Sequence, residues 1–229
     1  MLTDAMLLEQ LRQVPASHIE SAVGLLEARP RNQNVLGPGL SQLTRDPKSP
    51  TTIGYAITAH MGVSKNTKAV DSFDWFTFIS HMSGPKVICL SPAEPEETSG
   101  ILLGQISARI FSRLGVRGAI ADGFIRDTSS LAEIPFPTLA QGSMIRHGVP
   151  HVVDFGSPVS IRGAQIETGH IVAFDTDGAI AFPIELLRRI PEGLARMKAR
   201  TQPVLDYLAK NAQPTPEGLS AAQKEGSKH

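Results

Sequence analysis

Gly115-Val-Arg-Gly-Ala-Ile-Ala-Asp-Gly-Phe-Ile-Arg-Asp127 is the most informative stretch of this 229-residue sequence. Its first glycine follows a helical pattern over residues 100–114 and is a typical helix stop. Residues 117–122 then have the composition of a strand. The neighbouring elements of this unit are a buried strand, a short helix and a further strand, expected over residues 86–91, 129–134 and 137–141. Strand–helix–strand–helix–strand order indicates right-handed crossovers and a parallel sheet.

Outside this unit, the sequence predicts helices at both ends and short strands in its second half. Helices are expected over residues 2–14, 18–26, 74–81 and 186–208, the last with a break near Pro203. Strands are expected over residues 52–59, 149–153, 159–161, 171–174 and 179–182. Four prolines in residues 29–51 indicate a loop-rich crossing with at most short strands.

These elements predict one α/β domain over residues 1–209, with a parallel βαβ core, a β-rich second half and terminal helices. Residues 210–229 are rich in Ala, Gln, Pro, Glu, Gly and Ser. We expect them to be a loosely ordered C-terminal tail, or to reach a neighbouring subunit.

The charge balance argues against several classes of partner. Lys plus Arg equals Asp plus Glu, 22 each, whereas proteins that bind duplex DNA or a membrane surface usually carry a basic excess. No apolar stretch approaches the roughly 20 residues that span a bilayer, and no secretory signal pattern opens the chain. We therefore expect a cytoplasmic protein with no nucleic-acid or membrane partner. The single cysteine, Cys89, lies in an apolar run and is expected to be a buried strand thiol.

Chemistry is expected where the parallel strands end, because ligands bind beyond the carboxyl ends of such strands. The helix start near residues 100–107 offers free backbone N–H groups to an anion. The loop over residues 122–127 brings Arg126, which can bind a carboxylate with two hydrogen bonds, and Asp127, a hard oxygen ligand for Mg²⁺ or Mn²⁺. A cation beside an anion-binding arginine suits a 2-oxo acid. The alternatives for the Arg-Asp pair are a surface ion pair or a helix cap by Asp127.

Other polar and aromatic residues have structural interpretations. Asp175 and Asp177 are expected to form a turn, and the separated His60 and His81 are expected to be structural rather than metal ligands. A group of aromatic residues is expected to form core or a subunit contact: Phe73, Trp75, Phe76 and Phe78.

Four segments resemble the family of 4-hydroxy-4-methyl-2-oxoglutarate aldolases and the regulator of ribonuclease E activity A. They are Gly104-Gln-Ile-Ser-Ala108, Leu114-Gly-Val-Arg-Gly118, Asp122-Gly-Phe-Ile-Arg-Asp127 and Pro137-Thr-Leu-Ala-Gln-Gly142. A later stretch from Gly169 to Pro183 is similar to the family's Gly-Asp … Asp-Gly-Val … Pro signature. The resemblance covers about residues 50–190. It implies an α/β domain like the swivelling phosphohistidine domain, assembled as homotrimers or hexamers with sites near subunit interfaces.

The resemblance also implies a function. It is that of a class II, metal-dependent 4-hydroxy-2-oxo acid aldolase, a lyase that releases pyruvate through a metal-stabilised enolate, with oxaloacetate decarboxylation as a second activity. Asp127 would bind the Mg²⁺ or Mn²⁺ ion. Arg126 and the helix-start loop would hold the substrate carboxylate, the loop residues being Gly104, Gln105, Ile106 and Ser107. The 23 positions from Gly104 to Asp127 match the family spacing.

The catalytic roles implied by the resemblance fall on Arg126, Gln105 and Asp122, where Gln105 or Asp122 would assist a metal-bound water. A Schiff-base mechanism is not expected, because residues 87–187 contain no lysine and Lys86 opens a strand. A methyltransferase is not expected either, because no glycine-rich nucleotide loop precedes an acidic strand end.

Two positions depart from the family pattern. Gln105 stands where the aldolases carry an acid, and it has an oxygen acceptor but no charge; His170 replaces the acid of the late turn. The C-terminal acid that some aldolases borrow from a neighbouring subunit has no assigned counterpart among Glu217 and Glu225. The alternative function is a non-catalytic regulatory binding protein of the ribonuclease E regulator type. Retention of Asp127 favours the enzyme.

Overall fold

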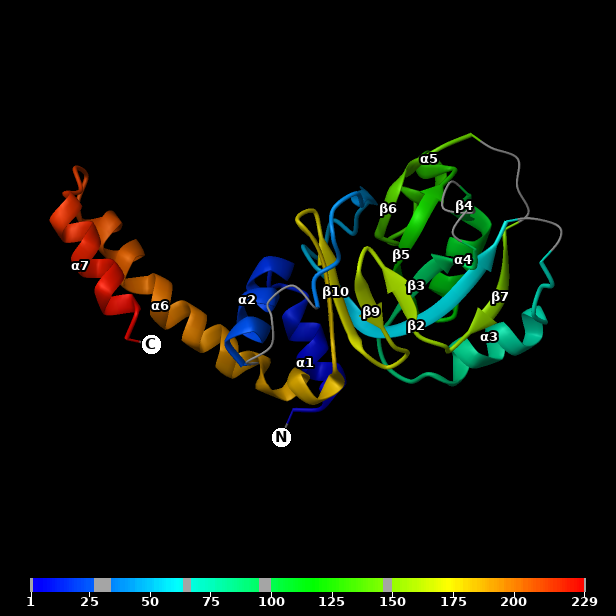
Figure 1. Ribbon diagram of the computed structural model, residues 1–229, viewed down its shortest axis with the longest axis horizontal. Coiled ribbons are helices and arrows are strands. Elements are labelled where there is room, and N and C mark those ends of the chain that lie inside the picture. Colours follow the sequence, from blue (N-terminus) through cyan, green and yellow to red (C-terminus); the bar gives the residue numbers. More distant parts are fainter. Residues whose placement is uncertain (1, 27–33, 64–66, 95–99, 146–149, 229) are drawn as a thin grey trace.

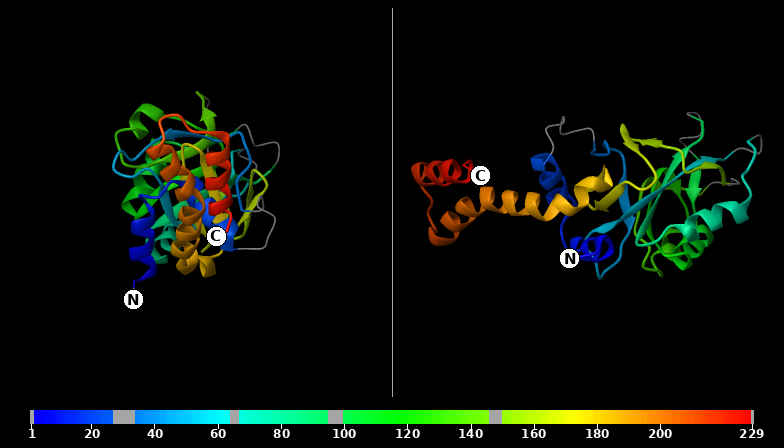
Figure 2. Two further views of the ribbon diagram at one scale, coloured as in Figure 1. Left: turned by 90° about the vertical axis from the view of Figure 1, so that its left-hand side faces the viewer. Right: turned by 90° about the horizontal axis from the view of Figure 1, so that it is seen from below.

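The computed structural model describes residues 2–26, 34–63, 67–94, 100–145 and 150–228. A nine-stranded sheet forms the body, helices cover it, and a two-helix arm extends from one end (Figures 1 and 2). The strands are β1 (Ser41–Thr44), β2 (Thr52–Gly62), β3 (Lys86–Pro92), β4 (Ile101–Leu103), β5 (Val116–Ile125), β6 (Thr138–Ser143), β7 (His151–Phe155), β8 (Val159–Ile161), β9 (Ala164–Ile166), β10 (Ile171–Asp175) and β11 (Gly178–Phe182). The helices are α1 (Asp4–Leu11), α2 (Ala16–Leu26), α3 (Ser72–His81), α4 (Gln105–Arg113), α5 (Thr128–Leu131), the 3-10 helix η2 (Ile184–Arg189), α6 (Ile190–Lys210) and α7 (Pro216–Gly226).

The centre of the sheet is parallel, as the sequence predicts. Its main order is β1-β6-β5-β3-β2-β10-β11, and β2, β3, β5 and β6 pair in parallel. Val87 and Cys89 of β3 point into one apolar cluster, and Ile88 and Leu90 point into another. A strand buried on both faces needs a continuous apolar run, which explains why this part of the sequence shows no polar alternation.

The two faces of the parallel strands are covered differently. Helices α3, α4 and α5 lie on one face around Trp75 and Phe111, and the β8–β9 hairpin lies on the other around Val159 and Ile161. Helices α1 and α2 and the 3-10 segment pack at the β10–β11 end around Phe182. The predicted α/β class with a β-rich second half and terminal helices is therefore confirmed. The likeness to the swivelling phosphohistidine domain stays a prediction.

The region before α4 differs from expectation. Residues 101–103 were expected to begin a helix, yet they form β4, a short strand parallel to the end of β5. Pairing with β4 and β6 also extends β5 to Ile125, so Asp122 lies within the strand and not in a loop. Three apolar residues cannot be identified as helix or strand by periodicity, and here sheet pairing decides.

Smaller differences concern the short strands. β1 and β9 add strands to the predicted set, β1 within the loop-rich crossing. The strand expected over residues 149–153 is found at His151–Phe155, and Val149 lies outside the described residues. No helix in the described ranges is long and apolar enough to cross a membrane.

Most of the expected loose tail forms the helix α7, and the alternative that the tail reaches a neighbouring subunit stays a prediction. α6 runs through Pro203 without the predicted break, and α7 folds back along it (Figure 2). Thr215 caps α7 by accepting a hydrogen bond from the N–H of Gly218 at 3.2 Å. The capping threonine followed by Pro216 is a helix-start signal that the tail's composition concealed.

Candidate active site

Gly104, Arg126 and Asp127 meet where two parallel strands end. β4 ends at Leu103 and β5 at Ile125, and the N–H of Arg126 donates to the Leu103 carbonyl at 3.0 Å. A Cβ at position 104 would lie 3.3 Å from Arg126 Cγ and 3.4 Å from Asp127 Oδ2. The predicted approach of the helix-start loop to the Arg-Asp pair is therefore present in the fold.

The start of α4 presents backbone N–H groups beside that pair. Gly104 is the N-cap in an extended conformation, and it has no side chain to cap the helix. The first bond of the helix runs from Ala108 N–H to the Gly104 carbonyl at 3.1 Å. The N–H groups of Gln105, Ile106 and Ser107 thus precede the helical ladder, and no acceptor for them is found in the described part of the chain. A carboxylate placed here would satisfy them and interact favourably with the helix dipole.

The Arg126–Asp127 pair is accessible. The guanidinium Nε lies 3.3 Å from Asp127 Oδ2, and the two side chains are 47% and 32% exposed. An ion pair this open to solvent contributes only about 0–1 kcal/mol to stability. Arg126 and Asp127 therefore do form a surface ion pair, as one of the two alternatives proposed. It leaves the other N–H groups of Arg126 able to bind a second carboxylate.

Asp127 has an unusual backbone. Its φ of 61° and ψ of 37° place it in the left-handed region, and it precedes α5 at the N-cap position. Its side chain makes no capping hydrogen bond, so the helix-cap interpretation is wrong. Non-glycine residues in this conformation cost on the order of 1 kcal/mol and concentrate at functional sites. The turn leaves the Asp127 carboxylate beside Gly104.

The donor set fits a hydrated divalent ion. Asp127 offers hard carboxylate oxygens, and the missing Cβ of Gly104 leaves space next to one of them. Within the described ranges, no group of three or more His, Cys, Asp or Glu side chains could hold a metal. Mg²⁺ commonly keeps several waters and takes only one or two carboxylates from the protein, so a single aspartate is compatible with it. Gln105 is half-buried at the first position of α4, and its side chain carries a neutral oxygen acceptor.

Asp122 has partners of its own. Its Oδ1 accepts a hydrogen bond from Gln141 Nε2 at 3.1 Å and lies 2.9 Å from Arg162 Nε. That Nε makes no hydrogen bond by geometry, so the contact is an ion pair with poor alignment. Arg162 comes from the turn between β8 and β9, on the face of the sheet opposite α4. The fold therefore commits Asp122 to a structural pair, and its predicted proton-transfer role stays a prediction. The sequence offered no signal for Arg162, because the pairing depends on tertiary contact.

Two buried groups lie away from the site. Burial raises the pKa of the Cys89 thiol to about 12, which agrees with the expected inert strand cysteine. Burial also lowers the pKa of Lys86, whose Nζ donates to the Ile79 carbonyl at 3.0 Å. Lys86 lies at the amino end of β3, and the candidate site lies beyond the carboxyl ends of β4 and β5.

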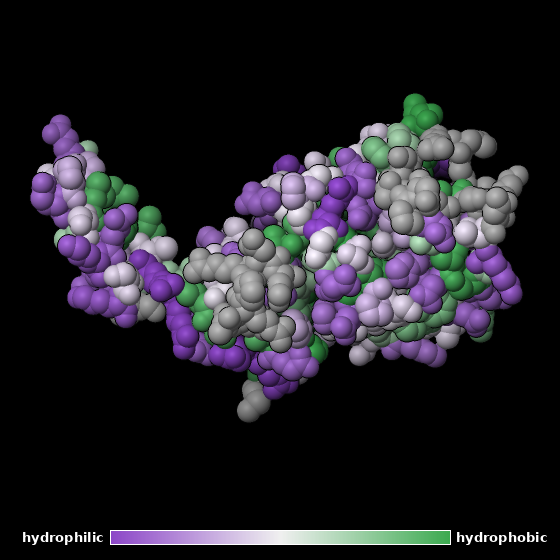
Figure 3. All heavy atoms as spheres, in the orientation of Figure 1, coloured by the Kyte–Doolittle hydropathy of each residue, from purple (hydrophilic) through white to green (hydrophobic). Residues whose placement is uncertain are grey.

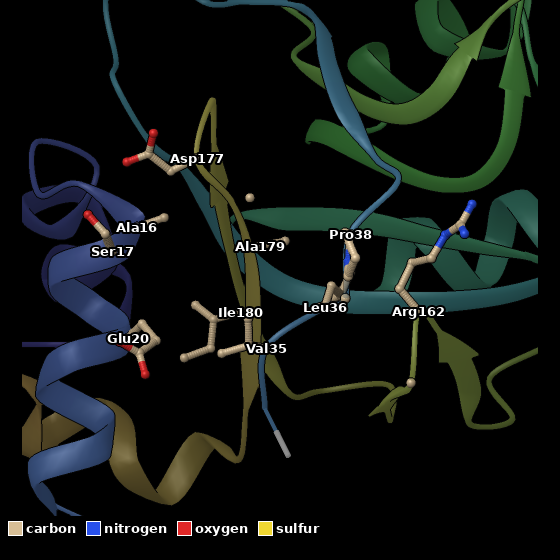
Figure 4. A pocket seen from close by; sticks show the side chains of 13 residues that line it. Ala16, Ser17, Glu20, Val35, Leu36, Pro38, Arg162, Asp177, Ala179 and Ile180 are labelled. Atoms are coloured by element: carbon tan, nitrogen blue, oxygen red, sulfur yellow. The ribbon is translucent and has the colours of Figure 1, made fainter. Parts of the chain in front are cut away.

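A further cavity lies away from this site. A hollow of about 590 Å³ lies between α2, residues 35–38 and the β10–β11 turn. Figure 4 shows Glu20 of α2 facing Ile180 of β11, with Arg162 extending away from α2. Nearby, Asp175 accepts from the Ala16 N–H at 2.7 Å and from the Asp177 N–H at 2.9 Å, which confirms the predicted turn role. This hollow shares no lining residue with the Gly104 loop or the Arg-Asp pair.

Comparison with known proteins supports the fold and gives a family. The sequence model of the RraA-like family, described as Aldolase/RraA, matches residues 18–181. An uncharacterized protein of Methanocaldococcus jannaschii is 25% identical over 141 residues, which cover 59% of this chain and 66% of that protein. The chain thus spans just under two thirds of that relative.

Solved structures share the fold at low identity. An uncharacterized protein from Pseudomonas syringae pv. tomato superposes with a TM-score of 0.71 at 18% identity, covering 95% of this chain and 92% of that one. Streptomyces coelicolor RraAS2, described as an unusual member of the RNase ES inhibitor RraA protein family, superposes with a TM-score of 0.65 at 21% identity, covering 86% and 94%.

Proposed function

The chain belongs to the RraA-like family, and from that premise we propose that it is a divalent-metal-dependent carbon–carbon lyase that releases pyruvate from 2-oxo acids. The main observation behind this proposal is that Gly104, Arg126 and Asp127 lie next to one another at the ends of β4 and β5. It joins an anion-binding helix start, a guanidinium and a free carboxylate oxygen. Those are the groups that a chelating 2-oxo acid requires.

Each residue has a task in this proposal. Arg126 and the N–H groups of Gln105, Ile106 and Ser107 bind the substrate carboxylate and fix its orientation. Asp127 holds the Mg²⁺ or Mn²⁺ ion. The bound ion would supply Lewis-acid stabilisation of the negative charge that develops on the keto oxygen. Gln105 orients a water by accepting a hydrogen bond from it at the side-chain carbonyl oxygen. A carboxylate at this position would attract the proton of that water more strongly.

The decisive experiment is a pyruvate-release screen. The protein is supplied with Mg²⁺ or Mn²⁺ and a panel of 4-hydroxy-2-oxo acids and oxaloacetate, with EDTA as the control. We expect release with metal and its loss with EDTA. Asp127→Ala and Arg126→Ala should each lower it, and Glu133→Ala, which removes an exposed ion pair with Arg109, serves as the matched surface control. Unchanged release in both site variants would reject the assignment.

The second candidate is a regulatory binding protein of the ribonuclease E regulator type. Gln105 in place of an acid and the single carboxylate at the site favour it. Inhibition of a ribonuclease of that type by both the wild type and Asp127→Ala, without metal and without pyruvate release from any substrate, would establish it. The lyase proposal would then be rejected.

The same proposal includes a homotrimer or hexamer with the site near a subunit interface. Ile106 is 65% exposed beside the site, and Leu205 on the arm is 55% exposed. Figure 3 shows hydrophobic surface interrupting the hydrophilic cover of the arm. Exposed apolar surface of this kind is typical of interfaces. Light scattering should give three or six times the 24.6 kDa chain mass, and a monomer would reject this part.

A further inference from the structure

A second cavity adjoins the candidate site and differs from it in chemistry. It has a volume of about 280 Å³ and lies between α3, α4 and β7. Its walls are mainly apolar, with Trp75, Phe76, Phe111 and Val152 among them. The described lining contains no Asp, Glu, Lys or Arg. The one titratable side chain in the described lining is His151, whose Nε2 already lies 2.9 Å from Thr67 Oγ1 and 3.1 Å from the Thr67 carbonyl. A carboxylate buried there would therefore lack the arginine or lysine partner that a buried charge needs.

The cavity and the carboxylate site share the β4–α4 turn. Leu102 and Ser107 line the cavity, and Gly104 between them faces Arg126 and Asp127. The Ser107 N–H is one of the three at the start of α4, about 3 Å along the helix axis from Gln105. The start of α4 therefore borders both the carboxylate site and the cavity.

One aromatic residue makes the cavity suitable for a ring or a branched chain. Trp75 is 3% exposed, and its ring lies 6.1 Å from Phe111 in an edge contact and 5.4 Å from Phe155. The volume equals roughly nine water molecules at about 30 Å³ each, enough for a small substituent rather than a whole substrate.

We infer that the substrate is a 4-hydroxy-2-oxo acid whose C4 substituent is apolar, a branched alkyl group or an aromatic ring, and that this cavity binds that substituent. The inference rests on the proposed function. In the reaction the C4 hydroxyl loses its proton, the C3–C4 bond breaks with its electron pair moving to the pyruvyl half, and C3 takes up a proton. The products are pyruvate and an apolar aldehyde or ketone. A substrate with a carboxylate at C4 does not fit this lining.

Trp75 is the only tryptophan in the sequence, so its fluorescence reports on the cavity directly. The test titrates the protein, with Mn²⁺ present, with three 2-oxo acids: pyruvate, 4-methyl-2-oxopentanoate and 2-oxoglutarate. We expect 4-methyl-2-oxopentanoate to change Trp75 emission and to bind at least tenfold more tightly than 2-oxoglutarate. Pyruvate should bind with a smaller change in emission. Equal or tighter binding of 2-oxoglutarate would overturn the inference.

A substitution that fills part of the cavity provides a second test. Ala69 lines the cavity and is exposed, so Ala69→Leu adds volume with little risk to folding. Ala69→Leu should weaken the binding of 4-methyl-2-oxopentanoate at least tenfold and leave pyruvate binding unchanged. The matched control is Ala195→Leu on exposed α6, which should change neither. No effect of Ala69→Leu would also overturn the inference.

The two proposals fail in distinguishable ways. Pyruvate binding that requires Arg126 and Asp127 would support the proposed function. If 4-methyl-2-oxopentanoate then binds no more tightly than 2-oxoglutarate, only the cavity assignment is rejected. If no 2-oxo acid binds or is cleaved, the proposed function is lost and the cavity assignment with it. Turnover of 4-hydroxy-2-oxo acids with apolar and carboxylate C4 groups should rank in the same order as binding.

Discussion

Two aspartates close to the end of β5 have contrasting surroundings. Asp122 is 16% exposed and contacts Gln141 of β6 and Arg162 of the β8–β9 turn. Asp127 is 32% exposed, and its carboxylate has only its neighbour Arg126, at 3.3 Å, as a described ion-pair partner. The two residues are five positions apart, and both looked suited to chemistry in the sequence. The difference indicates that a carboxylate committed to a tertiary ion pair supports the fold, whereas one left open can serve a ligand.

The backbone reinforces this contrast. Asp122 lies inside β5, at the irregularity in its pairing with β6 between Ala121 and Phe124, and its backbone is not left-handed. Asp127 adopts a left-handed conformation that most residues avoid. A cost of this kind is retained where the resulting side-chain position has a use. The contrast therefore predicts that changes at Asp127 affect activity and changes at Asp122 affect stability.

The largest expected effect is that of Asp127→Asn on turnover. Loss of the charge removes the metal ligand, and we expect kcat/KM for pyruvate release to fall at least 100-fold, or about 2.7 kcal/mol. The unfolding midpoint in urea should change little, because the carboxylate makes no capping bond. A variant with full activity, or one that is mainly destabilised, would reverse the assignment of the two aspartates.

Asp122→Asn should show the opposite behaviour. It leaves the Arg162 guanidinium, which is 29% exposed, beside a neutral amide, and we expect a loss of about 1–3 kcal/mol in unfolding free energy. Denaturant unfolding with an unchanged m-value measures it. Asp122→Leu combined with Arg162→Met removes both charges and should recover part of the loss. If Asp122→Asn kept full stability but lost the pH dependence of kcat, the proton-transfer role would hold.

Gly104→Ala tests whether the space next to Arg126 and Asp127 is needed for substrate binding. The added Cβ would lie 3.3 Å from Arg126 Cγ and 3.4 Å from Asp127 Oδ2, so both side chains must move by a few tenths of an ångström from the positions that the substrate carboxylate and the metal require. We expect KM for the 2-oxo acid to rise about tenfold, or about 1.4 kcal/mol. Gly24→Ala in α2 is the control, because its nearest contact is Glu20 Oε1 at 3.9 Å. An unchanged KM would separate Gly104 from substrate binding.

The smallest effect concerns a third carboxylate, Glu9, which bridges Arg12 and Arg117. Burial raises its pKa, but hydrogen bonds from the two arginines outweigh that and hold the pKa below its usual value. A depressed pKa stabilises the fold above the unfolded-state pKa of about 4.3, and that contribution is lost as pH falls through the folded-state pKa. Because Glu9 is half exposed, Glu9→Gln should cost about 0.5 kcal/mol or less at neutral pH.

Unfolding free energies of the wild type and Glu9→Gln, measured from pH 6 to pH 3, check the sign. The gap between the two should close toward acid and shrink in high salt. A gap that widened toward acid would contradict the lowered pKa.

Part of the fold could be predicted because its cause is local. The parallel unit around β3 and β5 follows from apolar runs buried on both faces and from glycine at a helix end. The sequence predicts a helix at β4 because three apolar residues fit either structure, and only the neighbouring end of β5 selects the strand. α7 was missed because its composition resembles a loose tail, although Thr215 and Pro216 mark its start.

The candidate site divides in the same way. The sequence by itself determined the chemical groups: a guanidinium, a carboxylate and a helix start without a side chain, with 23 positions from the helix start to the carboxylate. Only the tertiary structure decided which groups are available, because strand pairing brings Gly104 to Asp127 and the β8–β9 hairpin brings Arg162 to Asp122. Residue type fixes what a side chain can bind, and contacts between distant segments fix whether that capacity is already used.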